Sequence, residues 1–147
     1  MQAVLFIGLQ ASGKSSFYKE RFFSTHVRIN LDQLRTRYRE RKLLSVCLET
    51  ELPFVIDNTN PTPQIRSAYI AAARAARYSI IGYYFQSRVQ QCLTRNRLRP
   101  KPVPDTGILS TARTLKRPTF DEGFDTLRYV RLTDSGFIDE EWCDAVQ

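Results

Sequence analysis

The stretch that most constrains the fold lies near the start of the chain. Residues 3–7 are apolar, and residues 8–15 read GLQASGKS, which fits the pattern G-x-x-x-x-G-K-S. An apolar run without polar alternation is typical of a strand that is buried on both faces of a parallel sheet. A helix is expected from residue 14 to about residue 23. Between a strand and a helix, the pattern predicts a loop whose backbone N–H groups point at phosphate oxygens.

The residue types in this loop have separate expected roles toward ATP. The glycines let the backbone curl around the phosphates, Lys14 reaches the β- and γ-phosphates, and the Ser15 hydroxyl ligates Mg²⁺. A chance glycine-rich turn is the alternative, and the flanking strand and helix argue against it. The residues of this segment predicted to bind the nucleotide are Gly8, Ala11, Ser12, Gly13, Lys14, Ser15 and Ser16.

Apolar runs and helix-forming runs alternate along the rest of the chain. Strands are expected at residues 27–30, 53–57, 79–85 and 126–132, and helices at residues 31–50, 62–77, 88–98 and 106–115. Residues 100–104, PKPVP, predict a stiff exposed connection, because proline lacks the N–H donor that a helix needs. The alternation predicts an α/β fold, namely a P-loop NTPase-type parallel sheet of about five strands with helices on both faces.

The length of 147 residues suits one domain, expected to span residues 1–147 with an arginine-bearing lid at about residues 95–117. Charge is distributed unevenly, since residues 1–117 hold 20 Lys and Arg against 7 Asp and Glu, whereas residues 118–147 hold 2 against 8. An anionic ligand is therefore expected on the basic part, although a solvated basic surface is the alternative. About residues 134–147 are predicted to form an acidic C-terminal tail.

Composition argues against several classes of protein. No apolar run approaches the roughly 20 residues of a membrane-spanning helix, so no membrane partner is expected and an intracellular, cytoplasmic location is predicted. Cys47, Cys92 and Cys143 are odd in number and lack C-x-x-C spacing, which argues against a disulfide framework or a zinc site. His26 is the only histidine, so a metal centre built from several histidines is excluded.

Two carboxylates are candidates for the chemistry. Asp57 ends the apolar run at residues 53–56 and fits the Walker B position beside Mg²⁺; a turn-capping aspartate is the alternative. Asp32 follows the strand expected at residues 27–30 and is the candidate general base for an acceptor hydroxyl. Arg35 is expected on the same helix face as Asp32, as a clamp for an anionic acceptor. An N-cap aspartate with an i,i+3 ion pair is the alternative for this pair.

Three arginines lie close together in the segment RNRLR at residues 95–99. Arg95 and Arg99 are four residues apart, so they are expected on one helix face, where they converge on a phosphate group. Arg97 is expected to point away from that face. The alternative is a solvated basic helix end, which the helix dipole favours.

Five segments together resemble one family. GLQASGKS, NLDQLR, FVIDNTNPT, RNRLR followed by KPVPD, and PTFDEGFD occur in this order across residues 3–130. The set is similar to the P-loop polynucleotide 5′-kinase family, found as the kinase module of phage polynucleotide kinase and of animal polynucleotide kinase-phosphatase. The resemblance implies that the loop holds ATP and Mg²⁺ and that Asp32 is the general base for a 5′-OH. It also implies that Arg35 contacts the acceptor phosphate and that Arg95 and Arg99 grip the donor phosphates.

The expected function is therefore ATP- and Mg²⁺-dependent phosphoryl transfer to the 5′-OH end of DNA or RNA, in nucleic-acid end repair beside a separate ligase or phosphatase. Two departures from the family bear on this. The link after Asp32 is short, which leaves the preference for DNA or RNA open, and no Asp-x-Asp motif is present, so 3′-phosphate removal is not expected. A small-molecule kinase of the same fold and a nucleotide-binding module without transfer activity are the alternatives.

Overall fold

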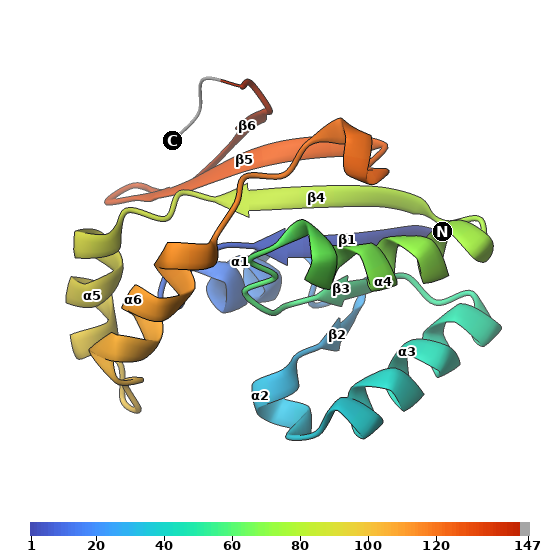
Figure 1. Cartoon of the computed structure of the whole chain (residues 1–147), viewed down its shortest axis with the longest axis horizontal. Coiled ribbons are helices and arrows are strands. Elements are labelled where there is room, and N and C mark those ends of the chain that lie inside the picture. Colours follow the sequence, from blue (N-terminus) through green and yellow to red (C-terminus); the bar gives the residue numbers. More distant parts are fainter. Residues whose placement is uncertain (145–147) are drawn as a thin grey trace.

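A central sheet organises the chain, whose computed structural model describes residues 1–144 (Figure 1). The strands are β1 (Gln2–Ile7), β2 (Val27–Ile29), β3 (Phe54–Ile56), β4 (Ser79–Phe85), β5 (Thr126–Thr133) and β6 (Gly136–Glu141). Their order in the sheet is β2-β3-β1-β4-β5-β6, and the first five are parallel whereas β6 runs antiparallel to β5. The predicted α/β fold with a mostly parallel sheet is confirmed.

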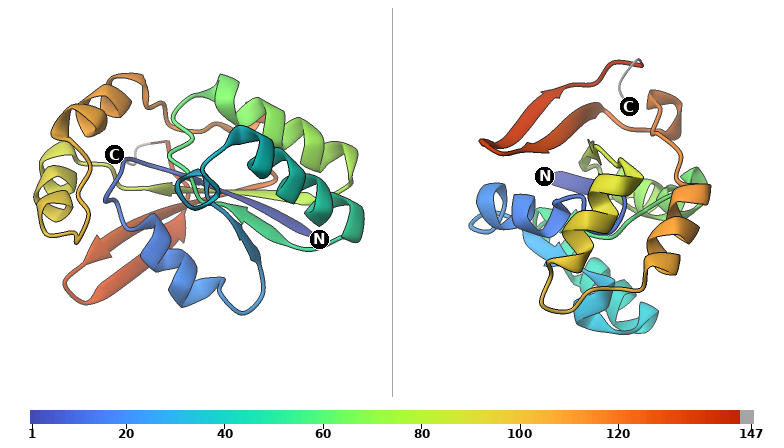
Figure 2. Two further views of the ribbon diagram at one scale, coloured as in Figure 1. Left: turned by 90° about the horizontal axis from the view of Figure 1, so that it is seen from below. Right: turned by 90° about the vertical axis from the view of Figure 1, so that its left-hand side faces the viewer.

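Helices cover both faces of the sheet (Figure 2). They are α1 (Lys14–Arg21), α2 (Leu31–Leu34), α3 (Arg37–Thr50), α4 (Pro63–Ala75), α5 (Val89–Arg97), α6 (Asp105–Thr114) and the 3₁₀ turn η1 (Phe120–Glu122). Phe17 and Phe22 bury α1 and its C-cap against one face, and Cys47 and Ile70 bury α3 and α4 against the other. Leu9 packs with α5 and α6 at the end of the sheet where the parallel strands finish. Polar groups at this end are therefore within reach of the phosphate-binding loop.

The predicted helix over residues 31–50 is wrong in one respect, because it is broken. α2 ends at Leu34, and Arg35 has a φ of +77°, which no continuous helix permits. Thr36 then begins α3 as its N-cap, with its side chain accepting from the backbone N–H of Arg39. Asp32 and Arg35 consequently do not share a helix face. The expectation that they act together rested on such a shared face.

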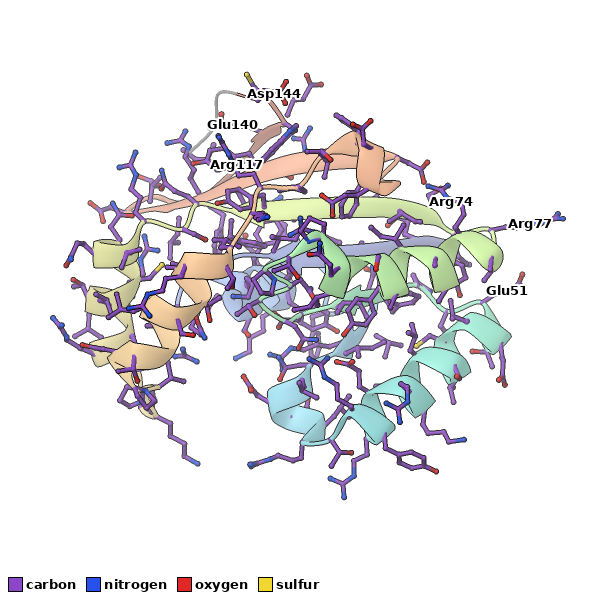
Figure 3. The ribbon with its side chains drawn as sticks, viewed as in Figure 1. Glu51, Arg74, Arg77, Arg117, Glu140 and Asp144 are labelled. Atoms are coloured by element: carbon purple, nitrogen blue, oxygen red, sulfur yellow. The ribbon has the colours of Figure 1, made fainter. Side chains whose placement is uncertain are left out.

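The predicted acidic tail is also corrected, because much of it forms the sixth strand. Its acidic side chains pair with arginines of β5: Arg128 Nε lies 2.8 Å from Asp139 Oδ1, and Arg131 binds Glu140. Cross-strand pairing thus neutralises part of the negative charge of this segment. Arg117 Nη1 donates to the Asp144 carbonyl at 3.3 Å, and both residues are labelled in Figure 3. Residues 145–147 of the predicted tail lie outside the described residues.

Candidate active site

The phosphate-binding loop, residues 8–15, joins β1 to α1 and depends on its two glycines. Gly13 immediately precedes α1 and has a φ of +101°, a conformation that L side chains rarely adopt. A Cβ atom at Gly8 would lie 2.9 Å from Ser12 Oγ and 3.0 Å from Phe85 Cβ, so only glycine fits without a shift. The backbone is therefore curled, with the N-terminus of α1 at its end, as an anion site requires.

Lys14 folds back over this loop. Its Nζ donates to the carbonyl oxygens of Gly8 at 3.0 Å and Leu9 at 2.6 Å, and its side chain is buried. Burial lowers the pKa of Lys14 to about 8, against the opposing effect of the nearby Asp57 carboxylate. The loop thus holds an ammonium group whose charge responds to pH near 8.

The structure brings Ser15 and Asp57 into contact beneath the loop. Asp57 directly follows β3 and is 1% exposed, and its Oδ2 accepts a hydrogen bond from Ser15 Oγ at 3.1 Å. Arg28 of β2 binds both groups, since its Nε donates to Asp57 Oδ2 at 2.8 Å and its Nη2 donates to Ser15 Oγ at 2.8 Å. Arg28 was missed by the sequence reasoning, although its register partner Val55 faces α1 and so places Arg28 on the same side.

This hydroxyl and carboxylate suit Mg²⁺, which prefers oxygen ligands. Proteins usually bind Mg²⁺ through one or two carboxylates together with phosphate oxygens of a nucleotide. Within residues 1–144, no group of three or more His, Cys, Asp or Glu side chains is placed to hold a metal ion by itself. A cation between Ser15 and Asp57 would therefore need phosphate oxygens to complete its ligands.

Asp32 lies at the mouth of the site, in the first turn of α2, with its side chain exposed. The N-cap of α2 is Asn30, whose side chain accepts from Gln33 N at 2.9 Å. The same Asn30 side chain donates to the Asp57 carbonyl at 2.6 Å, which ties α2 to the end of β3. The alternative of Asp32 as the helix cap is therefore wrong, and its carboxylate is left facing the site.

Arg37 occupies the place at this mouth that the sequence reasoning gave to Arg35. Arg37 Nη1 donates to Glu40 Oε1 at 3.0 Å and to Tyr69 Oη at 3.2 Å. Glu40 is only 3% exposed and also accepts from Asn58 Nδ2 at 3.0 Å. Burial, followed by the neighbouring Glu40, raises the pKa of Tyr69 to about 12, so this hydroxyl keeps its proton. The network fixes a guanidinium group whose position depends on tertiary contacts.

Polar contacts within the arginine-bearing segment tie the end of α5 to the connection that follows it. Asn96 is 1% exposed, and its side chain donates to Val103 O at 2.7 Å and accepts from Val103 N at 3.0 Å. α5 ends at Arg97, so Arg99 lies beyond the helix rather than on its face. Arg97 turns away toward Asp105, with 3.3 Å between Nη2 and Oδ2. Asn96, missed by the sequence reasoning, therefore joins the proline-bearing connection to α5 through these two hydrogen bonds.

One cavity of about 520 Å³ collects most of the predicted site residues. Those lining it are Ala11, Gly13, Lys14, Ser15, Ser16, Asp32, Asp57, Arg95 and Arg99. Gly8, Ser12 and Arg35 are absent from its lining, whereas Arg37 is present. A second cavity, also of about 520 Å³, adjoins the first, since both are lined by Arg95 and Leu132. The geometry places a phosphate loop, an exposed carboxylate and two arginines around one space.

Two of the quoted segments have structural roles that the sequence reasoning missed. Asn60, in NTN, is buried and donates to the Phe6 carbonyl at 2.7 Å, which fixes the segment after β3. Glu122, in PTFDEGFD, binds the fully buried Arg66 through two contacts of 2.7 and 3.0 Å. Arg66 also donates to the Lys116 carbonyl at 3.1 Å, so the ion pair anchors the chain after α6.

Comparison with known proteins gives the family. Residues 4–118, more than half of the chain, match the family described as AAA domain. The chain belongs to the AAA domain family. This AAA domain is 29% identical to the bifunctional polynucleotide phosphatase/kinase of Schizosaccharomyces pombe, in an alignment that covers 96% of this chain and 36% of that protein. It therefore spans about a third of the length of the curated relative that it matches.

Solved structures show where this fold occurs. Chaetomium thermophilum Kti12 in complex with ADP-AlF3 has a TM-score of 0.68 at 15% identity, with 90% of each chain covered. A gluconokinase from Sinorhizobium meliloti 1021 has a TM-score of 0.64 at 16% identity, with 90% of this chain and 83% of that chain covered. Mycobacterium tuberculosis APS kinase CysC with AMPPNP and APS has a TM-score of 0.55 at 17% identity, with 87% of each covered. The AAA domain therefore has the fold of P-loop kinases. Over residues 1–144, none of its helices is long and apolar enough to cross a membrane.

Proposed function

We propose that this AAA domain is a polynucleotide 5′-hydroxyl kinase, which transfers the γ-phosphoryl group of ATP to the 5′-OH end of DNA or RNA. The observation that carries the proposal is the single cavity lined by Lys14, Asp32 and the arginines Arg95 and Arg99. A kinase needs a phosphate cradle, a base for the acceptor hydroxyl and cations around the transferring group. The similarity to a polynucleotide phosphatase/kinase supports nucleic acid as the acceptor.

The donor is bound on the loop side of the cavity. The backbone N–H groups of the loop and the Lys14 ammonium group hold the phosphates, and Arg95 and Arg99 stabilise the charge of the transferring phosphoryl group from the lid at about residues 95–117. Ser15 and Asp57 would hold Mg²⁺, which would neutralise negative charge on the nucleotide phosphates. The second cavity, beyond Arg95, offers room for the base of the nucleotide.

The acceptor enters on the side of α2 and α3. Asp32 accepts the proton of the 5′-OH as its oxygen attacks the γ-phosphorus, and Arg37, fixed by Glu40, binds the phosphate next to the terminal nucleoside. Arg35 lies at the exposed turn between the two helices, where it extends the same basic surface toward the following nucleotides. The exposed Arg39 and Arg41 of α3 continue that surface, which favours a polyanionic acceptor over a small one.

The biological setting that we propose is nucleic-acid end repair. The relative combines a phosphatase and a kinase in one protein, whereas the described part of this chain folds as one α/β unit around a single sheet. A ligase or a phosphatase that acts on the same ends is the kind of partner that this setting implies. The gluconokinase among the structures of similar fold makes a small-molecule kinase the competing outcome of the test below.

The test is incubation with γ-labelled ATP and Mg²⁺ against matched acceptors: 5′-OH DNA, 5′-OH RNA, the same oligonucleotides with a 5′-phosphate, nucleosides, and gluconate or other small alcohols. Label is expected only on 5′-OH oligonucleotides, and binding to them should weaken steeply with added salt, because phosphate contacts release condensed cations. Label on a sugar alone would establish the small-molecule kinase. Tight ATP binding without transfer to any acceptor would establish a binding module.

A further inference from the structure

Arg28 is the residue whose contacts the proposed reaction does not use. Its side chain crosses from the edge strand β2 to α1 and donates to both proposed cation ligands, Ser15 Oγ and Asp57 Oδ2, each at 2.8 Å. Ser15 Oγ in turn donates to Asp57 Oδ2 at 3.1 Å. The three side chains form a closed triangle in which the guanidinium group is the positive member.

The buried carboxylate distinguishes this contact from an ion pair of similar geometry elsewhere in the protein. Arg128 provides a comparison, because its Nε also lies 2.8 Å from an aspartate, Asp139, and the two arginine side chains are 25% and 27% exposed. The Asp57 side chain is 1% exposed, however, whereas the Asp139 side chain is 20% exposed. A buried carboxylate needs a positive partner, and here Arg28 provides it.

Arg28 and a divalent cation would compete for the same oxygen atoms. A cation ligated by Ser15 Oγ and Asp57 would stand beside the guanidinium group, and two positive charges at that distance repel strongly in a partly buried site. Arg28 has neighbours toward which it can turn, since Gln33 Oε1 lies 3.5 Å from its Nη1 and the Tyr18 ring centroid lies 5.9 Å from its Cζ. Displacement therefore needs only a side-chain movement.

We propose that Arg28 and the divalent cation are alternative partners of the Ser15–Asp57 pair. Arg28 positions the two oxygen groups and keeps their affinity for a free cation low, and phosphate oxygens supply the extra ligands that let the cation displace it. The cation is then bound together with a nucleotide rather than before it. The inference rests on the proposed role of Ser15 and Asp57 as cation ligands.

The test measures Mn²⁺ binding without nucleotide, with the free ion counted by electron paramagnetic resonance. Mn²⁺ is a suitable probe because it takes the same oxygen ligands as Mg²⁺. Arg28→Met should bind Mn²⁺ about tenfold or more tightly than the wild type, because the competing charge is removed. Arg28→Lys, which retains a positive charge, should stay within about threefold of the wild type.

The matched control is Arg128→Met, which removes an arginine of similar exposure that also lies 2.8 Å from an aspartate, but on β5, which three strands separate from β2. Its Mn²⁺ affinity should equal that of the wild type. Asp57→Asn in the Arg28→Met protein should abolish the gain, which locates the bound ion. Should Arg28→Met fail to fold, Arg28→Gln keeps an amide donor toward Asp57 while losing the charge, and its affinity must rise as well.

An Mn²⁺ affinity that is the same or lower in the folded neutral variants would overturn the proposal and leave Arg28 as a structural ion-pair partner. These outcomes are separable from the kinase assay. If the affinities follow the expected order while no 5′-OH end is labelled, the substrate assignment fails and the role of Arg28 stands. If labelling occurs and the Mn²⁺ affinities do not change, the substrate assignment stands and the proposed role of Arg28 fails.

Discussion

A single buried ammonium group, that of Lys14, sets the pH range in which the loop attracts phosphate. It lies against two carbonyl oxygens, and burial lowers its pKa to about 8. As the pH rises through 8, the unliganded protein loses this charge. We therefore expect the dissociation constant of ATP to increase above pH 8, approaching about tenfold per pH unit, in calorimetric titrations between about pH 7 and 9.5. In Lys14→Met the affinity should be weak and nearly independent of pH over this range.

Folding stability should respond to the same group with a defined sign. The pKa of Lys14 is about 8 in the folded protein against an ordinary value of 10.5, so the unfolded chain binds more protons between these pH values. The free energy of unfolding contributed by Lys14 therefore rises from pH 8 to pH 10.5, and burial of the charge is most costly below pH 8. Urea denaturation of the wild type and Lys14→Met at both ends of this range measures the difference.

Asp32 allows binding and chemistry to be separated. Asp32→Asn keeps the shape of an exposed side chain that does not cap its helix, so folding and ATP affinity should persist. The amide cannot accept the proton of the 5′-OH, and kcat should fall by about 10²- to 10⁴-fold. Rapid-quench measurement of the transfer step checks this. Near-normal kcat would remove Asp32 from the role of base.

Among the elements, the connection from α5 to α6 depends on one buried amide. Asn96→Ala removes both hydrogen bonds to Val103 and leaves that backbone unpaired, so the free energy of unfolding should fall by about 1–3 kcal/mol. Arg99 follows Asn96 closely, and the chain that carries it should be less restrained, which raises the dissociation constant of ATP. Arg97→Ala is the control, because its ion pair with Asp105 is exposed and worth about 1 kcal/mol or less. Equal ATP affinities in the two variants would contradict this role of Asn96.

Elements with a strong signal in their own sequence were predicted well. The break at Arg35 and the strand β6 were missed for reasons that the residues concerned explain. The buried strands β1, β3 and β4 are apolar on both faces, and prolines marked the connection after α5. Arg35 itself gives no signal of the break, because arginine carries no preference for a positive φ, and the N-cap residue Thr36 beside it was overlooked. β6 was missed because its acidic residues suggested solvent exposure, while the arginines that pair with them lie on β5.

The residues of the candidate site likewise fall into those that a sequence motif locates and those that only tertiary contacts locate. Residues placed by a motif, such as Lys14, Ser15 and Asp57, were found from spacing alone and line the cavity. Arg28 and Arg37 were missed as site residues, since their places depend on which strand neighbours β3 and on a buried carboxylate in α3. Contacts of this kind require the packed fold.

For the whole molecule, the buried ion pair between Arg66 and Glu122 joins α4 to the chain after α6. Glu122→Ala would leave the guanidinium group of Arg66, which is 0% exposed, without its carboxylate. The free energy of unfolding should fall by about 3–5 kcal/mol in urea denaturation. Glu140→Ala removes the same type of side chain from a pair with Arg131, whose two side chains are 42% and 35% exposed, and should lower the free energy of unfolding far less. Similar losses in both variants would contradict the anchoring role of Arg66.

The last strand also reaches back to the first loop. Phe137 of β6 lies against the P-loop, 2.9 Å from where a Cβ of Gly13 would stand, and its ring packs edge-on against Phe17 of α1 at 5.1 Å between centroids. A ribosome makes the loop more than 100 residues before it makes Phe137. During synthesis, the nascent chain therefore carries every phosphate-binding residue of the loop long before it has the aromatic support beneath Gly13, and the loop reaches its final packing only when the β5–β6 hairpin closes.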